Sequence, residues 1–300
     1  MTFILPFRTV TVEDGEWIRN LIRSADTRNS DYTFGNILCW QKPYNIRVAD
    51  LQPGLIIEFD VDGLKVYSYP LGVEDESKLR EVIAQIPIVG GVSSEQAAVI
   101  ERLFPGQCKT EEFPDLFDYI YDIDRLAELS GKKLHAKRNY INRFTAQYPN
   151  YVVERLTRAN INECMMLDGI WISGKDDDAL TDEIPGEITA LEETLTNFCS
   201  LDMLGAVLRQ EPGGGIIAFT LGELLGRDTF NTHFEKAIAA IDGAYQMINR
   251  EFARIVKETY PFVKYINREE DLGLPNLRKS KHSYYPDLMQ EKLRVYLNHS

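Results

Sequence analysis

The stretch LIIEFDVDGLKVYSY, from Leu55 to Tyr69, predicts a β-hairpin. Runs rich in β-branched and aromatic residues flank Asp62-Gly63, a dipeptide typical of the two-residue turn between antiparallel strands. A further strand is predicted just before the hairpin, over Ile46–Ala49, and a turn at Pro53-Gly54 joins the two. Three consecutive strands linked by tight turns indicate an antiparallel meander.

Helices are predicted on both sides of this meander. Thr11 begins the first, which carries acids in its first turn and basic residues near its end, as the helix dipole favours. Ser93 and Gln96 have the spacing of a capping box and begin another helix. With short strands at 3–5, 86–89 and 109–113 and helices over 30–40 and 76–85, the expected order is β-α-α-β-β-β-α-β-α-β.

The second half of the chain predicts the same order. The expected elements are strand 151–156, helices 160–171 and 184–198, strands 203–208, 216–222 and 229–234, helix 242–257, strand 263–266, helix 276–282 and strand 292–297. A strand at 117–122, a short helix from 124 and a basic helix over 133–147 connect the two halves. The strand–helix–strand unit after each meander indicates a parallel crossover.

This repeated order resembles the GNAT topology of acyl-CoA N-acyltransferases. We therefore expect an α+β protein with two tandem GNAT-like domains, each a mixed, mostly antiparallel sheet flanked by helices. The expected domains are 1–122, and 123–300 for the connector helices plus the C-terminal GNAT-like domain that carries the site. A chain of 300 residues is long enough for two cores.

Composition and charge exclude several classes of function. No apolar run is long enough to span a bilayer, and MTFILPFRTV lacks the pattern of an export signal, so we expect no transmembrane segment and a cytoplasmic location. The four cysteines and four histidines have no metal-ligand spacing, so no metal site is expected. The net charge of −13 argues against general nucleic-acid binding. A local basic run at 125–143 holds six Lys or Arg and one acid.

The segment YINREEDLGLPNLRKSKHSYYP, from Tyr265 to Pro286, is the densest in chemistry. An apolar strand ends there in amide, carboxylate and guanidinium side chains, and Gly273 and Pro275 then turn the chain into a short basic helix. Loops at strand ends commonly carry binding and catalytic groups. A solvated loop with surface ion pairs is the alternative interpretation.

Three blocks of the sequence together resemble a known bacterial family. They are DYIYDIDRLAELSGKKLHAKRNYINRF (118–144), NTHFEKA (231–237) and the segment 265–286. The family is the C-terminal domain of phosphatidylglycerol lysyltransferase, and the similarity covers most of the chain. It implies a tandem GNAT fold, related to the Fem-like enzymes that use aminoacyl-tRNA, and membrane-bound members move lysine or alanine onto a lipid head group. We expect this chain to lack their transmembrane half, so the acceptor stays open.

In a GNAT domain the third meander strand and the following parallel strand splay apart, here 229–234 and 263–266, and exposed backbone N–H groups there can hold a developing oxyanion. Glu235 follows the first strand and Glu269 the second, so either is a candidate base, with Tyr284 or Tyr285 as candidate acid. The catalytic set we expect is Glu269, Glu235 and Tyr284. The expected substrate-binding residues are Lys137, Arg138, Asn139, Asn142, Lys236, Asn267, Arg268, Asp271, Arg278, Lys281 and Tyr285.

The donor is predicted from a missing motif. GNAT enzymes hold the pyrophosphate of coenzyme A on a glycine-containing loop at a helix N-terminus. The equivalent stretch AIAAIDGAYQ (237–246) keeps one glycine and carries Asp242 where phosphate would lie. Coenzyme A is therefore unlikely as cofactor, and an aminoacyl-tRNA is favoured. An acyl-CoA-dependent N-acyltransferase and a non-catalytic binding protein on a degenerate GNAT scaffold remain alternatives. An acidic loop at 176–183 either recognises a cationic group or is only solvated.

Overall fold

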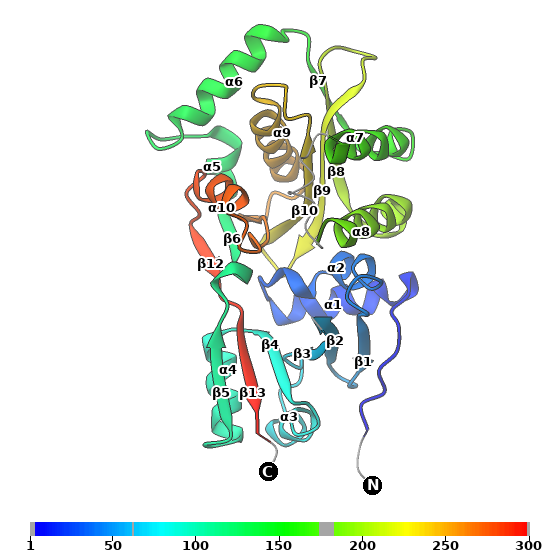
Figure 1. Ribbon diagram of the computed structural model, residues 1–300, viewed down its shortest axis with the longest axis vertical. Helices are drawn as coiled ribbons and strands as arrows, with labels where there is room; N and C mark the ends of the chain where they lie inside the picture. Colours follow the sequence, from blue (N-terminus) through cyan, green and yellow to red (C-terminus); the bar gives the residue numbers. More distant parts are fainter. Residues whose placement is uncertain (1–3, 62, 174–182, 299–300) are drawn as a thin grey trace.

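The computed structural model describes residues 4–61, 63–173 and 183–298, and Figure 1 shows two sheets arranged along its long axis. The first sheet has six strands in the order β1-β2-β3-β4-β13-β5. Its strands are β1 Arg47–Asp50, β2 Leu55–Val61, β3 Leu64–Ser68, β4 Ile88–Val92, β5 Cys108–Glu112 and β13 Leu293–Leu297. Its helices are α1 Gly15–Ala25, α2 Phe34–Cys39, α3 Glu76–Ile83 and α4 Ser94–Leu103.

The second sheet has seven strands in the order β12-β6-β11-β10-β9-β8-β7. Its strands are β6 Asp118–Asp122, β7 Val152–Arg155, β8 Leu204–Arg209, β9 Ile216–Leu225, β10 Thr229–Ala237, β11 Tyr265–Asn267 and β12 Leu288–Gln290. Its helices are α5 Ile123–Glu128, α6 His135–Gln147, α7 Ile161–Ser173, α8 Glu183–Asn197, α9 Ala244–Thr259 and α10 Pro275–His282. The acidic stretch 176–182 lies outside the described residues.

The expected meanders and crossovers are confirmed in both sheets. Strands β9 and β10 are antiparallel neighbours, and β10 pairs in parallel with β11, as β3 does with β4. The predicted first strand at 3–5 is wrong for its described part, because residues 4 and 5 form no strand. Instead, Arg8 forms an isolated antiparallel bridge with Val48 of β1.

The two halves exchange one strand each. Strand β13, from the C-terminal end, lies between β4 and β5, while β6 lies between β11 and β12. The sheets therefore do not divide at the expected boundary of 122/123. Period-two alternation predicts that 292–297 is a strand, but it says nothing about which edge the strand will join.

Helices cover both faces of each sheet. In the second sheet, α9 with α5 and α6 packs on one face and α7 with α8 on the other. In the first, α3 and α4 cover one face, and α1 and α2 the other, where Leu201 and Leu225 of the second half join the same core. The halves are thus joined through a shared apolar core as well as through exchanged strands.

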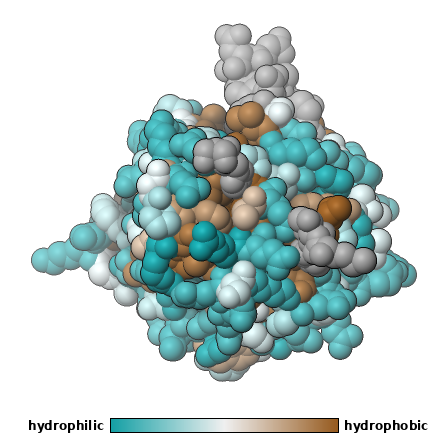
Figure 2. All heavy atoms as spheres, turned by 90° about the horizontal axis from the view of Figure 1, so that it is seen from below, coloured by the Kyte–Doolittle hydropathy of each residue, from teal (hydrophilic) through white to brown (hydrophobic). Residues whose placement is uncertain are grey.

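Within the described ranges, no helix is long and apolar enough to cross a bilayer. Figure 2, which views the molecule from the end that holds both termini, shows a mostly hydrophilic surface with smaller apolar areas between. Exposed apolar side chains scattered in this way are normal for a folded protein surface.

Candidate functional site

A cavity of ≈ 1090 Å³ lies between the two halves, at the point where β10 and β11 diverge. Strand β11 ends at Asn267, the partner of Asn231, and the chain then turns to β6, where Arg268 N–H donates to the Tyr119 carbonyl (2.9 Å). From Thr232 onward, the described structure pairs β10 with β9 alone. The predicted splaying is therefore present, and residues 232–236 line the cavity.

Glu269 enters this cavity from the loop after β11. Its Oε1 accepts hydrogen bonds from Asn231 Nδ2 (2.7 Å), Asn36 Nδ2 (3.0 Å) and His233 Nδ1 (3.0 Å). Burial by itself would raise the pKa of this carboxyl, but the hydrogen bonds from His233 and the two amides hold its pKa below the ordinary value. Glu269 is thus an ionised carboxylate with one oxygen fixed in place.

The backbone of Glu269 is in the left-handed region, with φ of 58°. That conformation is uncommon for a residue with a side chain and is retained where the surroundings impose it. The Asn267 side chain imposes it here, since its Oδ1 accepts from Glu269 N–H (2.7 Å) while its Nδ2 donates to Asp118 (2.9 Å) and to the Arg28 carbonyl (2.8 Å). Asn267 is fully buried, and these hydrogen bonds fix the conformation of the loop that carries Glu269.

His233 occupies an irregularity in β10, where the pairing register with β9 shifts between Thr232 and Phe234. Its Nε2 lies 2.9 Å from Glu223 Oε1 and its Nδ1 lies 3.0 Å from Glu269 Oε1. Burial opposes the charged ring, but hydrogen bonds to the two carboxylates outweigh it and raise the pKa of His233 to about 9.

Glu235, inside the diverging part of β10, and Arg268, just after β11, meet as predicted. Arg268 Nη2 lies 2.9 Å from Glu235 Oε1, and Asn249 donates to the other oxygen of Glu235 at 2.9 Å. The Arg268 guanidinium also lies 5.0 Å from the Tyr284 ring centroid. Its Nη1 is buried without a hydrogen-bond partner among the described residues, so this cation is only partly satisfied at the cavity wall.

Lys236 lies at another part of the cavity wall, in an acidic and aromatic setting. Its Nζ is 2.7 Å from Glu187 Oε1, 3.8 Å from Asp168 Oδ1 and 3.3 Å from the Trp171 ring centroid. Trp40 and Phe234, which also line the cavity, stack with their ring centroids 6.4 Å apart. This part of the cavity therefore combines a paired cation with flat aromatic surfaces.

A buried lysine from the exchanged C-terminal segment lies deeper. Lys292 Nζ is 2.7 Å from Asp31 Oδ1, 2.7 Å from Asp118 Oδ1 and 3.4 Å from Glu270 Oε2. Burial raises the pKa of Glu270 to about 7. Lys281 also lines the cavity, where its Nζ donates to the carbonyls of Arg268 and Glu270, and burial lowers its pKa to about 8.

Other predicted site residues hold the site together from outside the cavity. Asp271 is buried and accepts from Tyr119 Oη (2.5 Å) and Arg278 (2.8 Å), and these contacts hold its pKa at about 2 despite the opposing effect of burial. Arg278 also pairs with Asp115 at 2.5 Å. Neither Asp271 nor Arg278 is among the described residues that line the cavity.

The tyrosines do not take the positions that we predicted. Tyr284 is buried between Arg268 and Lys137, whose Nζ lies 4.0 Å from its ring centroid, and it does not belong to the described cavity lining. Tyr285 is 42% exposed and lies near Lys133. The proton-donor role predicted for these phenols finds no support in this placement.

No residue of the basic helix α6 is among the described residues that line the cavity, although Lys137 contacts the same Tyr284 ring as Arg268. Arg138 Nη1 donates to the carbonyls of Leu129 and Gly131, so the guanidinium joins α6 to the preceding turn. Asn139 Nδ2 lies 3.5 Å from His135 Nδ1, and Asn142 is exposed. Phosphate binding by Lys137, Arg138, Asn139 and Asn142 remains a prediction.

Sequence reasoning missed the residues that fix Glu269, namely Asn36, His233, Asn231 and Glu223. Glu223 carried a usable signal, because it is one carboxylate inside the otherwise apolar strand IIAFTLGELL, and a buried charge requires a partner. Asn231 and His233 lie in the quoted block NTHFEKA without having been singled out. Asn36 could not be found by pattern, since it reaches the site from the other half of the chain.

The stretch that replaces a phosphate loop is used for packing. Gly243 has φ of 85° and caps α9, and a Cβ there would lie 2.7 Å from the Tyr140 carbonyl of α6. Asp242 Oδ2 is 2.8 Å from Arg143 Nε. The one glycine in this stretch thus lets α6 approach closely, and an acid stands beside it.

Two such sheets, each with a meander, a crossover and a pair of neighbouring parallel strands, define a tandem GNAT-like protein. The chain belongs to the family described as "Phosphatidylglycerol lysyltransferase, C-terminal", whose family model matches residues 22–296. Comparison with curated proteins finds no match.

Solved structures agree with this family. A conserved protein of unknown function from Bacteroides thetaiotaomicron VPI-5482 is 37% identical with a TM-score of 0.91, and the match covers 98% of this chain and 100% of that one. L-PGS from Bacillus licheniformis is 17% identical with a TM-score of 0.60, covering 87% and 90%. FemX is 11% identical with a TM-score of 0.58, covering 98% of both chains. At 17% and 11% identity, the similarity to L-PGS and FemX shows a shared fold and nothing more.

Proposed function

We propose that this protein is an aminoacyl transferase that moves an aminoacyl group from a charged tRNA to an amine or hydroxyl acceptor. The observation that carries the proposal is the ionised Glu269 carboxylate, fixed by three donors at the divergence of β10 and β11. Family membership and the Fem-like fold support the same reaction class.

In the proposed reaction, the acceptor nitrogen or oxygen attacks the ester carbonyl of the donor. As the new bond forms, the attacking group becomes acidic and its proton passes to Glu269. The bond to the ribose oxygen then breaks, and the same carboxyl returns the proton to that leaving oxygen. Arg268 and Lys236 on the cavity wall, together with the β10 edge from Thr232, supply positive potential for the carbonyl oxygen as charge develops on it.

The cavity suits a nucleoside ester better than a pyrophosphate. Trp40 and Phe234 offer flat surfaces on which an adenine can stack. The N-terminus of α9, where coenzyme A would require close backbone approach to phosphate, is closed by the packing of Gly243 on α6 and carries Asp242. These features favour the tRNA donor over acyl-CoA.

The test measures transfer of a labelled amino acid from charged tRNA to an acceptor. Purified protein is incubated with [14C]lysyl-tRNA or [14C]alanyl-tRNA and either phosphatidylglycerol vesicles or a small peptide with a free amine. We expect transfer of label to one acceptor, and a loss of about 100-fold or more in Glu269→Gln, since a proton acceptor contributes roughly that factor. Glu58→Gln, in the first sheet, is the control. If Glu269→Gln transfers at the wild-type rate, the catalytic assignment is wrong.

A further inference from the structure

A single imidazole ring links Glu269 to a second carboxylate outside the large cavity. The side chains of His233 and Glu223 are each 2% exposed, and the ring nitrogens lie 2.9 Å and 3.0 Å from an oxygen of Glu223 and of Glu269. A neutral imidazole has one N–H and one lone pair. It would therefore turn a lone pair toward one carboxylate oxygen, whereas an imidazolium donates to both.

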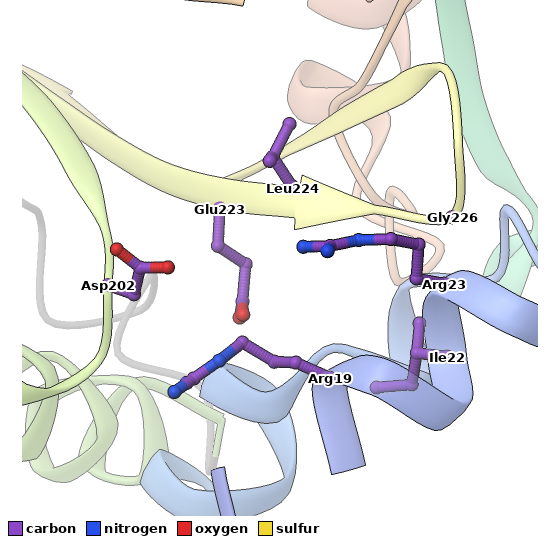
Figure 3. Close-up of a pocket in the computed structure, with 7 residues that line it drawn as sticks. All are labelled: Arg19, Ile22, Arg23, Asp202, Glu223, Leu224 and Gly226. Carbon is purple, nitrogen blue, oxygen red and sulfur yellow. The ribbon is translucent and has the colours of Figure 1, made fainter. Parts of the chain in front are cut away.

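Glu223 is itself held in position by the first half of the chain. Its Oε1 accepts from the backbone N–H of Gly35 in α2 at 2.6 Å, as well as from His233. It lines a separate cavity of ≈ 20 Å³ beside Arg19 and Arg23, and Figure 3 shows its side chain directed from β9 toward Arg19. Among the described residues, His233 is the side chain that contacts both Glu223 and Glu269.

We propose that Glu223 and His233 are positioning residues, with Glu223 keeping His233 an imidazolium so that the ring fixes Oε1 of Glu269 and leaves its other oxygen to the substrate. This inference rests on the proposed function for its catalytic consequence, while the protonation of His233 is independent of it. The charged groups that face the ring are Glu223 from β9 and Glu269 from the loop after β11, whereas α2 contributes the uncharged Gly35 N–H and Asn36 amide to these carboxylates.

Glutamine at position 223 tests the array. Glu223→Gln keeps an oxygen for Gly35 and His233 but removes the charge. We expect the pKa of His233, near 9 in the wild type, to fall by about one pH unit or more, because an opposite charge within hydrogen-bond distance shifts a pKa by roughly that amount. Titration of 15N-labelled histidine by NMR measures this, and the signal of His233 is assigned by its absence in His233→Gln.

The transfer assay supplies a second reading. Because the array needs a protonated His233, kcat should fall as pH rises through the pKa of His233, so the alkaline limb of the kcat profile moves to lower pH in Glu223→Gln. At a pH above that limb, a shift of about one unit lowers kcat about tenfold. KM should stay within about twofold, because Glu223 is outside the described lining of the large cavity.

Glu58 provides the matched control. It is also a glutamate buried on a sheet strand, but it pairs with Arg47 (2.5 Å) and Lys65 (3.1 Å). Glu58→Gln should leave the titration of His233 unchanged. If Glu223→Gln does not fold, Glu269→Gln removes the opposite carboxylate and must lower the pKa of His233 by the same reasoning.

The outcomes separate the two proposals. A neutral His233 at pH 7 in the wild type, or an unchanged His233 pKa in a folded Glu223→Gln, overturns the positioning role. A His233 that titrates as expected in a protein without transfer activity leaves the array in place and removes the proposed reaction. A lower pKa of His233 in Glu223→Gln, together with a shifted kcat profile, supports both proposals.

Discussion

Gly35 in α2 is the position at which one added methyl group should do most damage to the site. A Cβ there would lie 2.4 Å from Met203 Cε, 2.5 Å from Glu223 Oε1 and 3.0 Å from His233 Nε2. Met203 has a flexible side chain and can rotate away, but Glu223 is held by the same Gly35 N–H that carries the new methyl group. To reach an ordinary contact of 3.4 Å, the carboxylate would have to move by about 1 Å.

The cost of Gly35→Ala follows from these contacts. Weakening a hydrogen bond to a charged group costs about 1.5–3 kcal/mol, and overpacking a dense site costs about 1–3 kcal/mol. Replacing glycine by alanine inside a helix returns about 1 kcal/mol. We therefore expect the free energy of unfolding to fall by about 1.5–5 kcal/mol. Transfer activity should fall as well, because the displaced Glu223 no longer holds His233 against Glu269.

Urea denaturation of Gly35→Ala measures this cost, with Gly169→Ala as the matched control. Gly169 lies within α7, and a Cβ there would meet no heavy atom of the described residues within 4 Å. The control should therefore be neutral or up to about 1 kcal/mol more stable than the wild type. If Gly35→Ala unfolds within about 0.5 kcal/mol of the wild type, the close approach of α2 to Glu223 has been misjudged.

Three further predictions concern pH, coenzyme A and tRNA. Because the pKa of His233 is raised from 6.5 to about 9, its ion pairs stabilise the fold fully below pH 6.5. This stability is lost as pH rises through 9, and the pKa difference between the folded and unfolded states corresponds to roughly 3 kcal/mol. The urea midpoint of the wild type should therefore fall over this pH range, whereas the midpoint of His233→Gln should not show this fall. Calorimetry with acetyl-coenzyme A should show no micromolar binding, and a site competed by pantetheine phosphate would contradict the reasoning from Gly243. Arg138→Ala should lower the melting temperature, because its guanidinium bonds to the Leu129 and Gly131 carbonyls. If Arg138 also contacts phosphate, as predicted, its loss should lower the magnitude of the log–log slope of tRNA binding against salt by about 0.7–0.9, and an unchanged slope would contradict that prediction.

Much of the fold could be predicted from local patterns. The Asp62-Gly63 turn and the alternating apolar residues around it predict a meander without reference to the rest of the chain, and the capping box at Ser93 predicts where α4 begins. These signals are short-range, since turn geometry and capping depend on residues within four positions of each other. The end of β11 was predicted to within one residue for the same reason, whereas β10 runs on to Ala237, so Glu235 lies inside that strand rather than after it.

Only the tertiary structure decided which strands pair and which groups face the cavity. The exchange of β6 and β13 depends on edges that form once both sheets exist, and a strand's alternation is the same whichever edge it joins. Asn36 and Glu269 are 233 positions apart, yet their side chains lie 3.0 Å from each other. Tyr284, which the sequence places beside the basic segment, is turned inward under Arg268. The amino-acid sequence determined the elements and the polar strand ends, whereas the charge state of Glu269 depends on long-range contacts with His233, Asn231 and Asn36 that no local pattern encodes.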